Sequence, residues 1–205
     1  MPCFLAGESQ GRTLASALGI PFFACSHQQG HIAAAAWSAG RLDLLDKPML
    51  AWHLSGGTTE LLYVEPDGVN VKAALLGGTS DISAGQLIDR TGVLLGLEFP
   101  AGRAVDHLAR EGNDSRFSVK LDNFTFSLSG MENKVKTMAE QGAEKADIAR
   151  FALLTVADVV KRATLAALEQ YPGLPVLCSG GVASNTLLRQ VMEPLGAVFA
   201  QPRFS

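Results

Sequence analysis

The chain has no long apolar segment and only three cysteines, and both features limit the classes of protein to which it can belong. No apolar run reaches the roughly 18 to 20 residues that a membrane-spanning helix needs, and the first residues lack the basic start and apolar core of a signal peptide. Cys3, Cys25 and Cys178 lie far apart with no Cys-x-x-Cys pair, which fits free thiols in a reducing compartment. The sequence therefore predicts a cytoplasmic protein without membrane contact.

An excess of positive charge is also absent. The 17 Lys and Arg residues and 20 Asp and Glu residues give a formal net charge of -3, which offers no general attraction for nucleic acid. A polynucleotide partner would need a local basic patch or another subunit. With 47% hydrophobic and 18% charged residues over 205 positions, the chain can form one large or two small globular domains, and disorder is excluded as its main character.

Strand-like and helix-like segments alternate along the chain, which favours a layered α/β fold. The polar stretch at residues 40–48 is the predicted boundary between two lobes, residues 1–45 and 46–205. Residues 81–95 have a helical pattern, with Asp81 as the expected N-cap and Gly96 at the C-terminal end. The other predicted strands are residues 20–25, 49–54, 60–64, 124–128 and 175–178, and the other predicted helices are residues 10–18, 32–38, 102–112, 131 onward, 148–170 and 185–192.

Two of the four histidines, His27 and His31, lie one helical turn apart. Imidazoles at this spacing share a helix face and can hold one metal ion between them. Zinc or iron would need at least a third protein ligand. Gln28 also stands where a His-Glu-x-x-His motif carries its general base, and glutamine cannot take a proton. From the residues alone, N-cap, core or surface histidines remain the default interpretation.

Two glycine-rich turns, residues 55–59 and 179–185, each follow an apolar strand. Glycines let a phosphate or ribose approach the backbone, and successive N–H groups can form a nest for anions. The second turn also leads into a helix N-terminus, whose dipole favours negative charge. Neither turn has the spacing of a Walker loop or a dinucleotide fingerprint, so an ordinary tight turn stays open for each. Together they favour nucleotide binding.

The order of these motifs resembles the tRNA N6-adenosine threonylcarbamoyltransferase family, formerly described as O-sialoglycoprotein endopeptidases or glycoproteases. The resemblance runs from about Gly7 to Ser205. Residues 27–31 stand where the family has its His-x-x-Gly-His metal motif, and residues 54–57 stand at its Ser-Gly-Gly-His-Thr substrate loop. Residues 78–89 match a segment ending in a nucleotide-contacting aspartate, residues 100–102 a Pro-Gly-Gly turn, residues 126–130 a Phe-Ser-Phe-Ser-Gly segment, and residues 180–185 a Gly-Gly-Val-Ala-Ala-Asn turn.

The resemblance implies an actin- and sugar-kinase-like α/β fold with ribonuclease-H-like lobes, incomplete in this chain. The implied reaction moves threonylcarbamate from threonylcarbamoyl-AMP to N6 of the adenosine next to the tRNA anticodon. Implied partners are a non-catalytic paralogue and a small ATPase, with a homodimer left open. The implied metal, iron or zinc, is held by His27 and His31, and the implied substrate or nucleotide contacts are Leu54, Ser55, Gly56, Gly57, Asp89, Gly102 and Asn185.

The departures from the family pattern are as informative as the matches. Thr58 replaces the histidine of the substrate loop, and Gln29 replaces a commonly acidic residue. Ile82 and Gln86 replace an aspartate and a glutamate, while Glu132-Asn133 replaces a Lys-Thr pair. The family's first phosphate loop would precede Met1 and its third metal ligand, an aspartate, would follow Ser205. The chain is therefore expected to be a fragment or truncated paralogue that binds metal weakly or not at all.

Alternative interpretations remain open at this level. The lost acidic residues favour a non-catalytic, partner-binding paralogue. A metalloprotease is the weakest alternative, because Gln28 and Gln29 provide no general base for a metal-bound water. Without the resemblance, Asp89 would be a solvated helix residue and Asn185 a helix cap. His53 and His107 are interpreted as structural or exposed residues rather than ligands.

Overall fold

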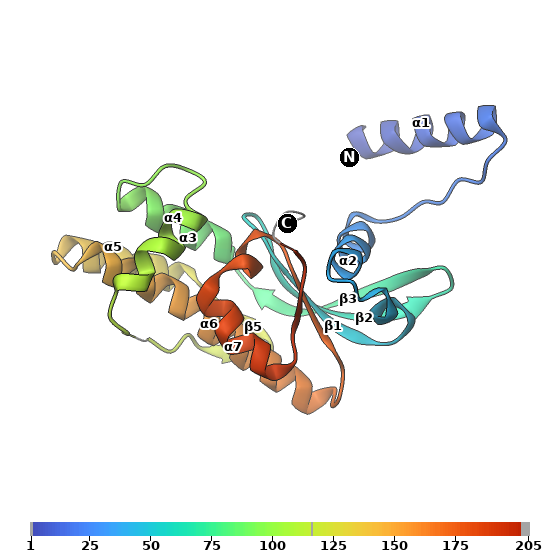
Figure 1. Ribbon diagram of the computed structural model, residues 1–205. Helices are drawn as coiled ribbons and strands as arrows, with labels where there is room; N and C mark the ends of the chain where they lie inside the picture. Colours follow the sequence, from blue (N-terminus) through green and yellow to red (C-terminus); the bar gives the residue numbers. More distant parts are fainter. Residues whose placement is uncertain (1, 116, 202–205) are drawn as a thin grey trace.

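The structure is a computed structural model that describes residues 2–115 and 117–201. Seven strands form one mixed sheet, and helices lie on both of its faces (Figure 1). The strands are β1 (Met49–Leu54), β2 (Thr59–Asp67), β3 (Asn70–Thr79), β4 (Leu121–Asp122), β5 (Thr125–Phe126), β6 (Val176–Ser179) and β7 (Val198–Phe199). The helices are α1 (Pro2–Leu18), α2 (His27–Ser38), α3 (Ala84–Leu94), α4 (Gly102–Leu108), α5 (Ser129–Glu140), α6 (Lys145–Gln170) and α7 (Thr186–Met192). Short 3₁₀ turns are η1 (Leu42–Asp46), η2 (Ala109–Glu111), η3 (Gly181–Ser184) and η4 (Glu193–Leu195).

The strand order in the sheet is β4-β5-β3-β2-β1-β6-β7. Strands β1, β2 and β3 form an antiparallel meander, whereas β6 runs parallel to β1 and β7 runs parallel to β6. A parallel neighbour requires a crossover connection, and the helices between β3 and β6 provide it. The carboxyl ends of β1 and β6 therefore lie at the same edge of the sheet.

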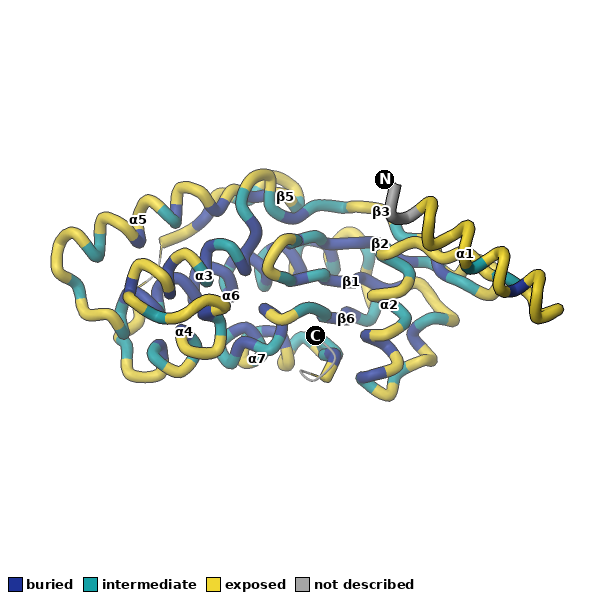
Figure 2. Tube along the Cα trace, turned by 90° about the horizontal axis from the view of Figure 1, so that it is seen from above, coloured by how far each residue is buried: buried dark blue, intermediate teal, exposed yellow. Residues whose placement is uncertain are grey.

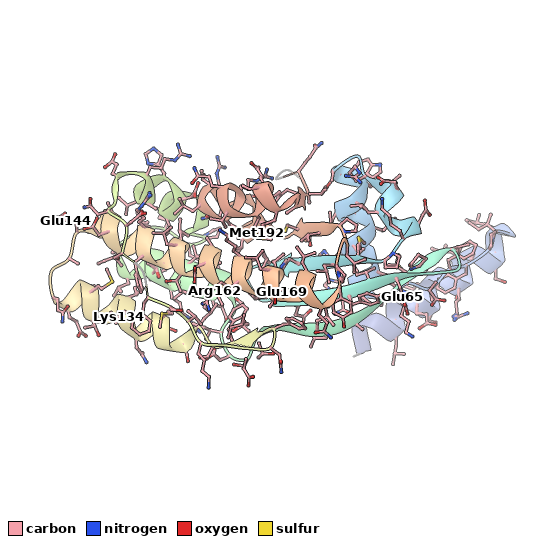
Figure 3. The ribbon with its side chains drawn as sticks, turned by 90° about the horizontal axis from the view of Figure 1, so that it is seen from below. Glu65, Lys134, Glu144, Arg162, Glu169 and Met192 are labelled. Carbon is pink, nitrogen blue, oxygen red and sulfur yellow. The ribbon has the colours of Figure 1, made fainter. Side chains whose placement is uncertain are left out.

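One face of the sheet packs against the helical layer. Leu50, Trp52 and Leu54 alternate along β1 with residues of the other face and share a core with buried residues of α3 to α7. Helix α6 crosses this face lengthwise, with Met192 of α7 beside it (Figure 3). The buried Trp52 Nε1 donates to Thr164 Oγ1 on α6 at 2.8 Å. This hydrogen bond satisfies the indole N–H inside an apolar core and fixes β1 against α6.

The opposite face carries a smaller core beneath α2. Met49 and Ala51 of β1 contact this core, which contains Ile32, Ala35 and Ala36 of α2. Helix α1 stands apart from both cores at the end of an extended segment (Figure 1). Residues 5–18 of this helix are mostly exposed (Figure 2), and Ala15 is the buried residue among them. Within the described residues, no helix is both long enough and apolar enough to cross a membrane.

The predicted α/β class is confirmed, together with most elements. The hairpin of residues 49–54 and 60–64, the long helix at 148–170 and the strand at 175–178 are all present within a few residues. The alternation at residues 124–128 also holds, because Phe126 and Leu128 are buried while Ser127 is exposed. Gly96 follows α3 at φ +85°, as expected for the end of a helix. The lobe boundary near residue 45 stays a prediction.

Two local predictions are wrong. Residues 20–25 form no strand and are mostly exposed. A strand needs a hydrogen-bonding neighbour, and the described sheet is built only from residues 49–199. Asp81 does not cap α3, because the helix begins after Ser83. The Ser83 hydroxyl accepts a hydrogen bond from Gln86 N, and Gln86 Oε1 accepts one from Ser83 N. Asp81 instead accepts hydrogen bonds from Ser127 and Leu128 at the start of α5.

Candidate functional site

The two glycine turns lie side by side at the carboxyl edge of the sheet. Residues 55–58 follow β1 and residues 180–184 follow β6, and the two strands are hydrogen-bonded neighbours. Gly180 has φ +92°, and a Cβ placed there would collide with the Leu54 carbonyl. Glycine is therefore required for the two turns to approach each other. Ligands bind outside the carboxyl ends of parallel strands in open α/β sheets, so this edge is the candidate site.

The turn after β1 is closed by its own serine. Ser55 N donates to Thr58 O at 2.8 Å, while Gly57 N and Thr58 N donate to Ser55 Oγ at 3.3 and 3.0 Å. A Cβ placed on Gly56 or Gly57 would meet no heavy atom within 4 Å. The outer surface of the turn is thus open to a ligand, which would compete with the Ser55 hydroxyl for the N–H groups.

The start of α3 supports this turn from behind. Ser83 Oγ donates to the Gly56 carbonyl at 2.6 Å, and Ala84 N donates to Thr59 Oγ1 at 2.8 Å. Gly85 lies so close that a Cβ there would stand 2.5 Å from Gly56 Cα. The first turn of α3 therefore holds the glycine turn in place.

Asp89 of α3 and Gly102 at the start of α4 are brought close by the loop that joins the two helices. Ala101 N donates to Asp89 Oδ1 at 2.8 Å, which ties this carboxylate to the first turn of α4. Gly102 begins α4, and a Cβ there would meet no heavy atom within 4 Å. Asp89 keeps a second carboxylate oxygen for other contacts.

Asn185 has a capping role in the structure. The residue is 9% exposed, and its Oδ1 accepts from Leu188 N at 3.0 Å at the start of α7. Asp106 of α4 accepts from Thr186 N and Thr186 Oγ1 at 3.0 and 2.6 Å. These contacts fix the second glycine turn between α4 and α7. The cap interpretation of Asn185 is confirmed, and its contact with a substrate stays a prediction.

The predicted histidine pair lies at the start of α2. Ser26 and Gln29 form a capping box, which places the helix start directly before His27. The two Nε2 atoms of His27 and His31 are 3.0 Å apart, and both side chains are exposed. The helical spacing therefore does make the two ring nitrogens converge, as the sequence predicts.

A third imidazole lies against this pair. His53 of β1 is half-buried, and its ring centroid is 4.6 Å from that of His31. The sequence interpretation left His53 outside the site. The alternation along β1 could have revealed it, because His53 lies on the same face of the strand as Met49 and Ala51, the face that α2 covers. His53 also lies two residues before Ser55, so the histidine cluster and the first glycine turn share one end of β1.

The pKa values of His31 and His53 are both lowered. Burial is the main cause that lowers the pKa of His31, followed by the nearby His27. Burial likewise lowers the pKa of His53, with further contributions from His31 and His27. Neutral imidazole is the form that ligates metals. The pair fits two positions of a metal site, although no group of three His, Cys, Asp or Glu residues in the described ranges is arranged to hold an ion.

Several residues that depart from the family pattern make structural contacts. Gln29 Nε2 donates to the Val71 carbonyl at 2.6 Å, linking α2 to β3. Glu132 of α5 pairs with Arg90 of α3 at 2.7 Å and with Lys136 at 2.8 Å. Hydrogen bonds from Lys136 and then Arg90 lower the pKa of Glu132 despite partial burial. These side chains stabilise helix contacts near the site.

Comparison with known proteins identifies relatives over nearly the whole chain. A family model described as tRNA N6-adenosine threonylcarbamoyltransferase matches residues 1–204. A protein of that name from Lactiplantibacillus plantarum is 35% identical over 206 residues, covering 95% of this chain and 57% of the relative. Another from Enterococcus faecalis is 37% identical over 199 residues, covering 92% of this chain and 55% of the relative. The chain thus spans little more than half the length of these relatives.

Solved structures support the fold at lower identity. A HypF structure from T. kodakarensis has a TM-score of 0.67 at 19% identity, covering 92% of this chain and 36% of that one. A full-length HypF in a phosphate- and nucleotide-bound form has a TM-score of 0.69 at 14% identity, and the match covers 89% of this chain and 40% of that one. These similarities confirm the mixed α/β fold that the sequence predicts; the actin- and sugar-kinase-like lobes implied by the resemblance stay a prediction.

Proposed function

Because this chain belongs to the tRNA N6-adenosine threonylcarbamoyltransferase family, we propose that the whole protein transfers threonylcarbamate from threonylcarbamoyl-AMP to N6 of the adenosine next to the tRNA anticodon. The observation that carries the proposal is the pairing of the two glycine turns at the carboxyl edge of β1 and β6. At this edge, the backbone N–H groups of Gly57 and Thr58 would exchange the Ser55 hydroxyl for an adenylate phosphate as their acceptor.

The residues of the chain act mainly by positioning. The turn at residues 55–58 would face the phosphate, with Leu54 ending the strand beneath it. Asp89, Gly102 and Asn185 would border the nucleoside. The adenosine amine attacks the carbamoyl carbon, the bond from that carbon to the phosphate oxygen breaks, and AMP leaves while the amine gives up a proton. Fixed donors at the edge of the sheet would stabilise the charge that develops.

A metal at the histidine pair belongs to this proposal. His27 and His31 would hold one divalent ion, iron or zinc, through their converging Nε2 atoms. Such an ion supplies Lewis-acid polarisation of the activated acyl group. The formal charge of -3 gives this chain no general attraction for tRNA. We therefore propose that tRNA is held through a complex with the non-catalytic paralogue and the small ATPase, and a homodimer fits the same need.

The test uses the whole protein with both partners and tRNA that lacks the modification. Mass spectrometry of the digested nucleosides should detect threonylcarbamoyladenosine. Gly57→Val places a branched side chain on the open face of the turn and should lower the rate by about 100-fold, because small misplacements of a reacting group have effects of that size. Gly130→Ala, in open space on α5, is the matched control. Absence of product from a folded, fully supplied wild-type complex would disprove the transferase.

A non-catalytic, partner-binding paralogue is the second candidate. It is favoured by the structural use of Gln29 and Glu132, which departs from the family pattern, and by Thr58 in the substrate loop. This candidate predicts complex formation with the partners but no product in the same assay. Size-exclusion chromatography of the mixture separates it from a protein that has simply lost its fold.

A further inference from the structure

Strand β3 has one side that the rest of the sheet leaves largely uncovered. On one side, β2 pairs with β3 from Asn70 to Gly78. On the other side, β5 pairs only with Gly78 and Thr79. Over its earlier residues, β3 is therefore the outermost strand of the sheet (Figure 2). An outermost strand presents backbone N–H and C=O groups with which a further strand can pair.

The register with β2 shows which groups point outward. Val71 lies opposite Pro66, which has no N–H to donate. Val71 N donates to Asn70 Oδ1 at 2.9 Å, and Val71 O accepts from Gln29 Nε2 at 2.6 Å. Both backbone groups of Val71 therefore point away from β2, and side chains of the same chain already satisfy them.

Ala73 and Leu75 continue this alternation. The register of β3 with β2 is regular from Asn70 to Leu75, and in an antiparallel pair every second residue directs both backbone groups outward. Within the described residues, no backbone group pairs with the outward groups of Ala73 and Leu75. The Leu75 side chain is also 64% exposed. Neither proline nor a charged residue, which commonly protect such an edge, occurs within residues 73–76.

The uncovered stretch is closed at both ends. Gln29 covers Val71 at its start. At its end, a Cβ placed on Gly77 would collide with the Phe124 carbonyl, so the chain leading into β5 already lies there. The stretch in between, residues 72–76, is called the open edge below. At about 3.4 Å per residue, it accepts a strand of about five residues.

A second copy of the chain does not fit the open edge. A two-fold axis at Ala74 would pair Ala73 of each copy with Leu75 of the other and would use all of the outward groups. The same axis would place Asn70, at the hairpin end of each copy, opposite Gly78 of the other, where β5 already pairs. The open edge therefore fits an extended segment with no hairpin close to its paired residues.

We propose that the open edge of β3 binds an extended segment of a partner protein by strand addition. Alternate residues of the segment pair with the N–H and C=O groups of Ala73 and Leu75. Their side chains are apolar, because they lie beside the exposed Leu75. A residue opposite Lys72 is acidic, since Lys72 is exposed and its ion pair with Glu65 is long, at 3.9 Å. This interaction surface does not depend on the proposed function.

The test follows amide hydrogen exchange of the 205-residue chain by NMR, with the synthetic peptide acetyl-Thr-Thr-Val-Thr-Val-Glu-Thr-amide as the probe. In the chain alone, the amides of Ala73 and Leu75 should exchange fast, whereas that of Ala74, which faces β2, should exchange slowly. With the peptide at about ten times its dissociation constant, exchange at Ala73 and Leu75 should slow by about 10-fold.

Matched variants separate backbone pairing from apolar adhesion. N-methylation of either valine of the peptide removes a donor that faces β3 and should abolish the protection. N-methylation of the threonine between the valines, whose N–H faces away, should preserve it. On the chain, Ala73→Pro removes the outward N–H without changing the bonds to β2 and should weaken binding by about 10-fold. Ala73→Val keeps that N–H and is the matched control, and circular dichroism confirms that both variants are folded.

Three outcomes would overturn the open edge as a binding surface. They are protection of the Ala73 and Leu75 amides in the chain alone, unchanged exchange at millimolar peptide, and equal effects of N-methylation at the valines and at the threonine between them. Failure of the transfer assay would leave the open edge untouched, because none of these readouts involves the glycine turns or the histidines.

Discussion

The two faces of the sheet differ in both depth and content. On one face, buried residues of β1 join those of α3 to α7 in a single large core that includes Trp52 and Cys178. On the other face, α2 and η1 cover a smaller core around Met49 and Leu177. The histidine cluster lies at the edge of this smaller core. The helical layer therefore contains the larger buried core, while the α2 face presents the histidine cluster.

The difference follows from the alternation of side chains along β1, which gives the two faces of the sheet different contacts. Successive side chains of β1 point to opposite faces, so Trp52 anchors the helical layer while its neighbour His53 reaches the histidine pair. The two glycine turns follow β1 and its neighbour β6 at the same edge of the sheet. A rigid core on one side thus positions groups on the other side and at the edge.

The largest expected effect comes from emptying the helical-layer core. Trp52→Ala removes a fully buried ring and its hydrogen bond to Thr164, and should lower the free energy of unfolding by about 3 to 5 kcal/mol. Met49→Ala, on the α2 face of the same strand, should lower it by about 2 kcal/mol, because fewer elements surround that cavity. Urea denaturation measures both. Equal losses would break the proposed contrast between the two faces.

A smaller effect is expected where the helical layer meets the site. Gly85→Ala would place a methyl group 2.5 Å from Gly56 Cα and from the Ser55 carbonyl, and should destabilise the fold by about 1 to 3 kcal/mol. Gly130→Ala, also at the second position of a helix but in open space, should stabilise by about 0.5 to 1 kcal/mol. Thermal denaturation compares the pair. If Gly85→Ala leaves the stability unchanged, α3 does not hold the glycine turn in place.

The smallest effect concerns the link between β3 and α5. Partial burial opposes ionisation of Asp81, but hydrogen bonds from Ser127, Ser129 and Leu128 lower its pKa well below the ordinary range. A depressed folded-state pKa gives stability that is present above the unfolded value near 4 and is lost as the pH falls below it. After solvent screening, Asp81→Asn should destabilise the fold by about 1 kcal/mol at pH 7.

The pH dependence provides the check on that link. The difference in unfolding free energy between the wild type and Asp81→Asn should stay constant from pH 7 to about 5 and shrink below about 4. Asp122→Asn, an exposed carboxylate of β4, is the control. A difference that does not shrink in acid would mean that the ionised carboxylate is not the stabilising form.

The sequence predicted elements whose signals are local. The hairpin around residue 56, the 26-residue helix α6 and the alternation at Phe126 and Leu128 were all visible as periodicity. The strand expected at residues 20–25 failed because strand formation depends on a partner, which periodicity does not report. The prediction of Asp81 as the N-cap of α3 was wrong because Ser83, two residues later, forms the capping box. Asp81 instead accepts a hydrogen bond from Leu128 N at the start of α5.

The candidate site was predictable in part. The spacing of His27 and His31 and the two glycine turns could be read directly, and the family supplied Asp89 and Gly102. The third histidine could not be found in this way, because His53 is brought to His31 by the crossing of α2 over the sheet. The close approach of Gly180 to Leu54 likewise follows from the parallel pairing of β1 and β6.

By itself, the sequence determined the helix and strand periods, the capping box before His27, the glycine content of the turns and the family. Each of these depends on residues within one or two turns of each other. Only the tertiary structure decided which face His53 joins, which turn Gly85 supports and which helix Asp81 stabilises. Those outcomes depend on contacts between residues 22 to 47 positions apart, and such contacts are set by how whole elements pack rather than by local preference.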